Sequence, residues 1–164
     1  MIVALLVAAT LVVQRVLGAP GAPPWTAGML LPMVWLVAPR IRNPLPGVPL
    51  AAIALGIGWD LLLEPVIGVG GIAWSAAALA IAGVAALVAD RSPFAWFGFG
   101  ALGAVVMVAV RDLALLPLGL ASRLDLVDVF RSALLTGAWV GLVGWVLALD
   151  LPARWRRYRV RRLR

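Results

Sequence analysis

Apolar residues occur along the chain in long runs, which are broken where Pro, Gly and charged residues cluster. The bilayer core holds no water that could bind unpaired backbone groups, so a segment in lipid must stay helical. We therefore expect each helix to end at such a break. The runs predict six helices, at about 2–17, 25–38, 48–63, 71–89, 94–116 and 127–149. The second run is short for a crossing and contains Pro32, so a kinked or re-entrant segment, with five crossings in total, is the alternative.

Composition places this pattern in a membrane. Hydrophobic residues make up 64% of the 164 positions and charged residues 13%, against roughly 45–50% and about 25% in soluble domains. A water-soluble globule is excluded on that ground. We expect an all-α integral membrane protein with a compact bundle of six transmembrane helices in residues 1–150. Residues 151–164 are expected to form a separate Arg-rich tail.

The arginines fix the expected orientation. The net charge of +7 would indicate nucleic acid binding in a soluble protein, but seven of the 14 arginines lie in the last 11 residues. Basic residues near spans favour the cytoplasmic side, where anionic lipids attract them. The predicted protein is therefore a multi-pass membrane protein with both termini cytoplasmic. The arginines expected at the membrane surface are Arg154, Arg156, Arg157, Arg159, Arg161 and Arg162.

Residue types exclude several kinds of chemistry. The chain has no Cys and no His, which excludes disulfides, thiolate nucleophiles, imidazole bases and His-ligated metals. A membrane aspartyl protease needs two carboxylates that meet, one commonly in a Gly-x-Gly-Asp context. Here Trp59 separates Gly58 from Asp60. We therefore expect neither catalysis nor a cofactor.

Five charged residues lie within or close to predicted spans, in the outer half of the bilayer: Arg15, Asp60, Glu64, Arg111 and Asp112. An ionisable side chain inside a span costs at least about 2.5–3.5 kcal/mol at the helix centre, which makes each a candidate functional residue. Asp60 precedes Glu64 by one helical turn and shares its face. The sequence predicts a polar pocket open to the outside, with Asp60 facing Arg15 or Arg111.

Three further charges lie at the outer start of the last predicted span. Asp125 and Asp128 are expected to be helix-start residues, matched to the helix dipole. Arg131 is long enough to reach the lipid headgroups, and we interpret it as a snorkelling residue. None of the three is predicted to belong to the pocket.

The most informative stretch is Gly56-Ile57-Gly58-Trp59-Asp60-Leu61-Leu62, followed by Gly68. Gly56 and Gly58 are interpreted as helix-packing positions, because small residues let helices approach closely. In its Gly-x-x-x-Asp-Leu-Leu…Gly pattern, length and span arrangement, the chain resembles the MreD family of rod shape-determining proteins. The match falls on Asp60 and the surrounding glycines, whereas Arg15, Arg111 and Asp112 rest on topology alone.

The resemblance implies a non-catalytic component of the bacterial cell-elongation (Rod) complex, which supports peptidoglycan synthesis and rod shape. Such proteins lie in the bacterial inner membrane with MreC, a single-span and mostly periplasmic protein, near the peptidoglycan polymerase RodA and its transpeptidase. The predicted pocket would then dock an MreC-like partner. Its expected residues are Arg15, Trp59, Asp60, Glu64, Gly68, Arg111 and Asp112.

A transporter subunit is the alternative. Small six-helix substrate-binding subunits of energy-coupling-factor vitamin transporters have a similar size and an outward pocket. They often carry an Ala-x-x-x-Ala face on the first helix, which Ala4 and Ala8 match. In a chain this rich in Ala, that match has little weight.

Overall fold

The computed structural model of the chain describes residues 2–23, 26, 28–42, 48–64, 66–88, 92–120 and 125–149. Within these ranges the regular structure is helical. The helices are α1 (Ile2–Leu17), the 3-10 turn η2 (Leu31–Met33), α2 (Val34–Arg42), α3 (Val48–Leu63), α4 (Val69–Leu87), α5 (Pro93–Leu115), the 3-10 turn η3 (Leu116–Leu118) and α6 (Leu126–Ala148). The predicted tail and its membrane-surface arginines lie outside the described residues.

The all-α prediction is confirmed for this part of the chain, and helices lie within two residues of five of the six predicted segments. Three of them are long and apolar enough to cross a membrane: Val69–Leu87, Pro93–Leu118 and Leu126–Ala148. Helices α1 and α3 have 16 residues each, which gives about 24 Å at 1.5 Å per residue. That length falls short of a hydrocarbon core about 30 Å thick.

The second predicted segment is not one continuous helix, which is a correction to the sequence prediction. Thr26 has 3-10 geometry, residues 28–30 do not, and a 3-10 turn with Pro32 near its start begins at Leu31, before α2 follows from Val34. Residues 28–30 are irregular, and Gly28 has a φ of +87°. The left-handed conformation of Gly28 interrupts a right-handed helix. Pro32, four residues later, has no N–H group to donate to a preceding turn.

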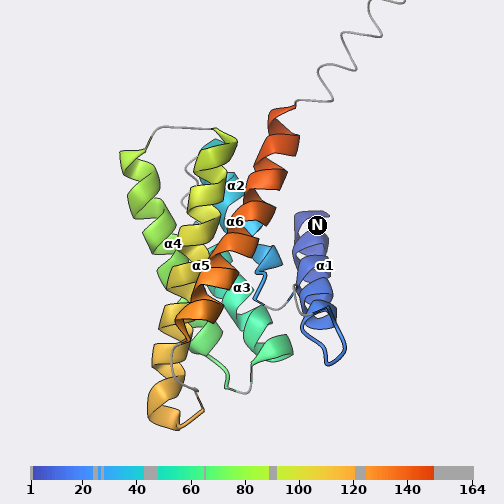
Figure 1. Ribbon diagram of the computed structural model, residues 1–164, viewed down its shortest axis with the longest axis vertical. Helices are drawn as coiled ribbons and strands as arrows, with labels where there is room; N and C mark the ends of the chain where they lie inside the picture. The colour runs from blue at the N-terminus through green and yellow to red at the C-terminus, as the bar shows by residue number, and fades with distance from the viewer. Residues whose placement is uncertain are drawn as a thin grey trace, which may run out of the picture.

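The helices pack side by side, with neighbours in sequence running in opposite directions through α3, α4, α5 and α6 (Figure 1). Helix α5 packs extensively against α6, and α4 lies between α3 and α5. Helix α1 lies to one side and contacts mainly α3 and η2. The carboxyl ends of α1, α3 and α5 therefore gather at the same end of the bundle as the amino ends of α4 and α6, at the bottom of Figure 1.

Local signals explain where the last two helices begin. The Ser92 side chain accepts a hydrogen bond from the Ala95 N–H, and Pro93 occupies the first turn of α5. The Asp125 side chain accepts from the Val127 N–H at 2.9 Å and caps α6. Both arrangements satisfy amide groups that have no partner within the helix. The prediction that Asp125 starts a helix is confirmed, and Asp128 lies in the first turn as expected.

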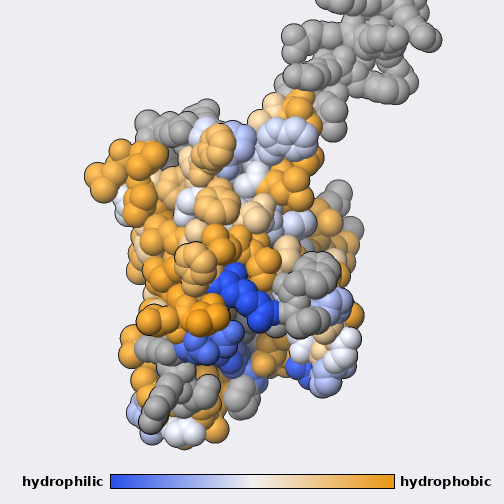
Figure 2. Space-filling model, viewed as in Figure 1, coloured by the Kyte–Doolittle hydropathy of each residue, from blue (hydrophilic) through white to orange (hydrophobic). Residues whose placement is uncertain are grey.

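The buried core is shared by several helices and includes residues of η2, α4 and α5. Trp74, Met33, Ile81 and Met107 are buried there. A Cβ atom at Gly103 would lie 2.7 Å from the Met33 sulfur, so the glycine lets η2 approach α5 closely. The outward faces carry large exposed apolar side chains, which Figure 2 shows as hydrophobic surface over most of the visible face, with the most hydrophilic surface in its lower half. This distribution is typical of a bundle that faces lipid.

Candidate functional site

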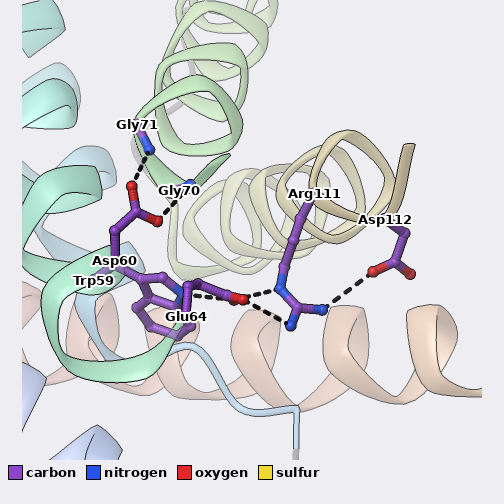
Figure 3. A network of polar contacts seen from close by, with 7 residues as sticks. All are labelled: Trp59, Asp60, Glu64, Gly70, Gly71, Arg111 and Asp112. Atoms are coloured by element: carbon purple, nitrogen blue, oxygen red, sulfur yellow. Dashed lines mark hydrogen bonds and ion pairs between the residues drawn. The ribbon is translucent and has the colours of Figure 1, made fainter. Parts of the chain in front are cut away.

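The turn between α3 and α4 is organised by Asp60, which is only 2% exposed. Its carboxylate accepts hydrogen bonds from the backbone N–H groups of Gly68 at 2.7 Å, Gly70 at 2.6 Å and Gly71 at 3.4 Å. These amides belong to the start of α4, where the helix dipole favours a negative charge. Figure 3 shows the Asp60 side chain reaching from α3 to this helix start. The carboxylate therefore caps α4 from a neighbouring helix.

Glycines make that reach possible. Gly68 has a φ of +104°, a conformation that side-chain-bearing residues rarely adopt. A Cβ atom at Gly56 would lie 2.7 Å from the Gly71 nitrogen and 2.8 Å from the Gly70 carbonyl carbon. The backbones of α3 and α4 thus touch at Gly56, one turn before Asp60. The interpretation of Gly56 as a packing residue is confirmed.

One turn further along α3, Glu64 forms an ion-pair network with α5. Its carboxylate accepts two hydrogen bonds from Arg111, from Nε and, at 3.1 Å, from Nη2. The Arg111 Nη1 atom lies 3.1 Å from Asp112 Oδ1, and the Trp59 indole N–H donates to Glu64 at 3.2 Å. The Glu64 side chain is 3% exposed and that of Arg111 35%. The bidentate pairing with Arg111 offsets the hydration that the buried Glu64 carboxylate has lost (Figure 3).

The irregular segment before α2 is held by side chains from two other helices. Gln14 of α1 donates to the Met29 carbonyl at 2.7 Å and accepts from the Leu31 N–H at 2.9 Å. From α6, Ser132 donates to the Gly28 carbonyl, Thr136 accepts from the Leu30 N–H, and Trp139 donates to the Leu31 carbonyl. Non-helical backbone inside a membrane protein requires such internal partners.

A partly open cavity of about 400 Å³ lies between these elements. Its wall is built from α1, the irregular segment, α3, α5 and α6. The lining residues are Gln14, Gly18, Gly28, Leu30, Trp59, Leu63, Glu64, Met107, Val108, Arg111, Asp112, Asp125, Asp128, Arg131 and Ser132. The lining therefore combines apolar side chains with charged and other polar side chains.

Four of the seven predicted pocket residues line this cavity: Trp59, Glu64, Arg111 and Asp112. Asp60 and Gly68 lie behind its wall, in the cap of α4. The expectation that Asp60 faces Arg15 or Arg111 is wrong, because its oxygens bind backbone amides and Arg111 pairs with Glu64 and Asp112. A carboxylate that is close to a helix N-terminus can be satisfied without a cation, and this geometry cannot be read from a pattern of charges along the chain.

Arg15 is exposed and is not among the residues that line the cavity. Its neighbour Gln14 takes that place, because successive helix residues point about 100° apart. Asp125, Asp128 and Arg131 line the cavity although they were not predicted to belong to it. The half-buried Arg131 side chain lies on the cavity wall.

The sequence did contain a signal for the residues that were missed. Thr10 and Gln14 are four residues apart on α1, as Ser132 and Thr136 are on α6. Polar residues at this spacing within apolar helices share one face, and in a membrane such a face tends to bind another polar element. Their partner, an irregular backbone between them, could not be identified from the spacing alone.

The arrangement offers charged groups and apolar surface for binding. Within the described ranges, no three His, Cys, Asp or Glu side chains are grouped so that they could hold a metal ion. Comparison of the chain with protein-family models, with curated proteins and with solved structures gives no match.

Proposed function

We propose that the protein is a non-catalytic, multi-pass component of the bacterial inner membrane that binds and positions an MreC-like partner of the cell-elongation machinery through its polar cavity. The observation that carries this proposal is the location of the sequence stretch that resembles the MreD family. Trp59 lies on the cavity wall, and Asp60 fixes the turn that follows Glu64. One residue of this stretch thus lines the cavity, and Asp60 and Gly68 hold the turn behind it.

The charge distribution supports a docking role. The polar side chains gather at one end of a bundle whose outer faces are apolar (Figure 2). In the proposed orientation, with both termini cytoplasmic, this end faces the periplasm. A partner with a single span and a periplasmic domain would meet the cavity where its chain leaves the membrane. RodA and its transpeptidase would be reached through that partner, and the Arg-rich tail would contact anionic lipids.

The test is affinity purification of the tagged, full-length protein from native membranes, with quantitative mass spectrometry of the proteins that co-purify. Arg111→Gln breaks the network on the cavity wall, and Arg15→Gln is its matched control at an exposed position outside the cavity. We expect recovery of an MreC-like protein to fall at least about fivefold with Arg111→Gln, because the variant leaves two carboxylates without their cation. The control should retain recovery near the wild-type level.

Glu64→Gln is the second variant, because it keeps the side-chain length and removes only the charge. Size-exclusion elution of each purified variant reports whether the bundle is intact. Equal recovery with all variants would contradict docking at the cavity. Absence of any MreC-like protein from the wild-type sample would contradict the proposed partner.

The cavity volume also fits an alternative, a small-molecule site in a transporter subunit, which the same purification tests. About 400 Å³ lies within the usual range for small-molecule sites, roughly 300–1,000 Å³. Recovery of paired ATPases together with a membrane coupling subunit would identify the protein as the substrate-binding subunit of an energy-coupling-factor type transporter.

A further inference from the structure

The end of α5 extends beyond the polar network of the cavity. The ion pair places Arg111 level with Glu64, the residue that directly follows α3. From Arg111 the chain continues through the last turn of α5 and the 3-10 turn η3 to Leu118. These residues add about 10–12 Å at roughly 1.5–2.0 Å per residue. Figure 1 shows this end of α5 projecting past the end of α3, at the bottom of the view.

The projecting end is apolar and exposed. No charged residue lies between Asp112 and Arg123 in the sequence. The large apolar side chains that stand exposed here, which we call the apolar tip, are Leu113, Leu116, Leu118 and Leu120. Segments that connect helices in water are normally polar. Four exposed leucines on such a segment therefore require a cover other than water.

The backbone of this turn is closed by its own hydrogen bonds. Gly119 follows η3 with a φ of +68°. Its N–H donates to the Leu116 carbonyl at 3.0 Å, and the Leu120 N–H donates to the Leu115 carbonyl at 3.3 Å. This pair of bonds is the Schellman motif, which gives partners to carbonyl groups that a helix end leaves free. Because lipid offers no hydrogen bonds to the backbone, this internal pairing lowers the cost of placing the turn in a bilayer.

The apolar tip also continues a membrane-facing surface. Residues Pro93–Leu118, η3 included, form one stretch of 26 residues that is apolar enough to cross a membrane. At the start of α6, Leu126, Val127 and Phe130 are exposed, although they alternate with charged residues that line the cavity. At the level of the cavity, the outward side chains are thus apolar and the inward ones charged. Helices that are still surrounded by lipid at that level show this distribution.

We propose that the turn that ends α5 lies in the outer leaflet of the bilayer, with the apolar tip in contact with lipid, and that the cavity network lies below the headgroups. The inference rests on the membrane location and orientation in the proposed function, and it needs no partner protein. It specifies which part of a partner reaches the cavity. That part is a segment still inside the outer leaflet, and a domain in the periplasm would remain above the cavity.

The test measures the depth of the apolar tip with spin labels. The chain has no Cys, so a single Cys carries the label at a chosen position. Leu118→Cys and Leu120→Cys report on the tip, and both positions are exposed, so a label there needs no change in the core. Val105→Cys, on an exposed position in the middle of α5, is the lipid control. Arg159→Cys, in the Arg-rich tail of the sequence, is the water control.

The labelled full-length protein is placed as single copies, without a partner, in phosphatidylcholine nanodiscs. Electron paramagnetic resonance then measures how often the label collides with oxygen, which concentrates in lipid, and with a nickel chelate, which stays in water. We expect the tip labels to collide with the chelate at least about threefold less often than the tail label, as the Val105 label does. In lipids with shorter acyl chains the tip labels should become more accessible to the chelate, because the tip lies near the edge of the hydrocarbon core.

Two results would overturn the proposal. Equal access of the chelate to the tip and tail labels would place the turn in water. Shielding of the tip labels from both oxygen and the chelate would mean that protein, and not lipid, covers the tip.

The assay contains no partner, so its outcome is separate from that of the purification. Lipid contact at the apolar tip combined with failure to recover an MreC-like protein would contradict only the partner. Recovery of that partner with the tip in water would contradict only the depth proposed here.

Discussion

Two buried carboxylates, Asp60 near the end of α3 and Glu64 directly after it, lie one turn apart and have different partners. Asp60 is enclosed between α3 and α4, and its partners among the described residues are backbone N–H groups. Glu64 lines the cavity and pairs with a guanidinium from α5. The first therefore holds α3 to α4, and the second, itself buried, holds the partly exposed Arg111 guanidinium in the cavity wall. Charge inside an apolar bundle does not by itself indicate a binding residue, because the partner of the charge decides its role.

Asp60→Leu gives the largest expected loss of stability and tests whether Asp60 holds α3 and α4 together. The substitution leaves the start of α4 without its acceptor and should lower the free energy of unfolding by about 3 kcal/mol or more. Unfolding of the purified protein in detergent, followed by circular dichroism against denaturant, measures the change. Leu61→Ala, at an exposed neighbouring position, is the control and should have an effect below about 1 kcal/mol. Similar losses from both variants would contradict a capping role for Asp60.

Gly56→Ala tests the helix contact that lets Asp60 reach α4. The added methyl group would overlap backbone atoms of Gly70 and Gly71, which cannot rotate away as a side chain can. We expect a loss of about 1–3 kcal/mol in the same unfolding assay. Gly83→Ala is the matched control, because a Cβ atom there has no neighbour within 4 Å, and alanine favours a helix. A neutral Gly56→Ala would show that α3 and α4 do not depend on this approach.

Asp125→Ala has the smallest expected effect and compares the exposed cap of α6 with the buried cap that Asp60 provides for α4. Removal of this exposed cap of α6 should cost about 0.5–1 kcal/mol of unfolding free energy. Thermal melting of the purified variant beside Asp125→Asn, which retains a capping oxygen, measures it. A loss as large as that of Asp60→Leu would mean that the exposed cap of α6 stabilises the protein as much as the buried cap of α4.

The parts of the fold that were predicted correctly depend on local chemistry. Breaks at Ser92-Pro93 and Asp125 are visible in the sequence because capping residues and proline act on their own helix. The partner of Asp60 was not predicted, because three amides brought together by a turn leave no charge pattern in the sequence. The same holds for residues 28–30, whose hydrogen-bonding partners lie on α1 and on α6.

The candidate site was predicted in part for a related reason. Glu64, Arg111 and Asp112 stand out as charges in apolar runs, so their presence at a common polar site follows from topology and the cost of burial. Which residue of a helical pair faces the cavity depends on the rotation of the helix. That rotation placed Gln14 on the wall and Arg15 outside it. Helix rotation is set by packing over the whole bundle, which a single run of residues does not reveal.

The irregular segment before α2 also has a consequence for biosynthesis. Three of its backbone groups bind side chains of α6, which follow in the chain by 104, 106 and 108 residues. At about 5–20 residues per second, the ribosome takes on the order of 5–20 s to produce that length. During this interval the segment lacks the Ser132, Thr136 and Trp139 groups that later hold it. The cavity wall therefore reaches its final form only after the last helix has been synthesised, and a chain truncated before α6 would leave this backbone without those partners.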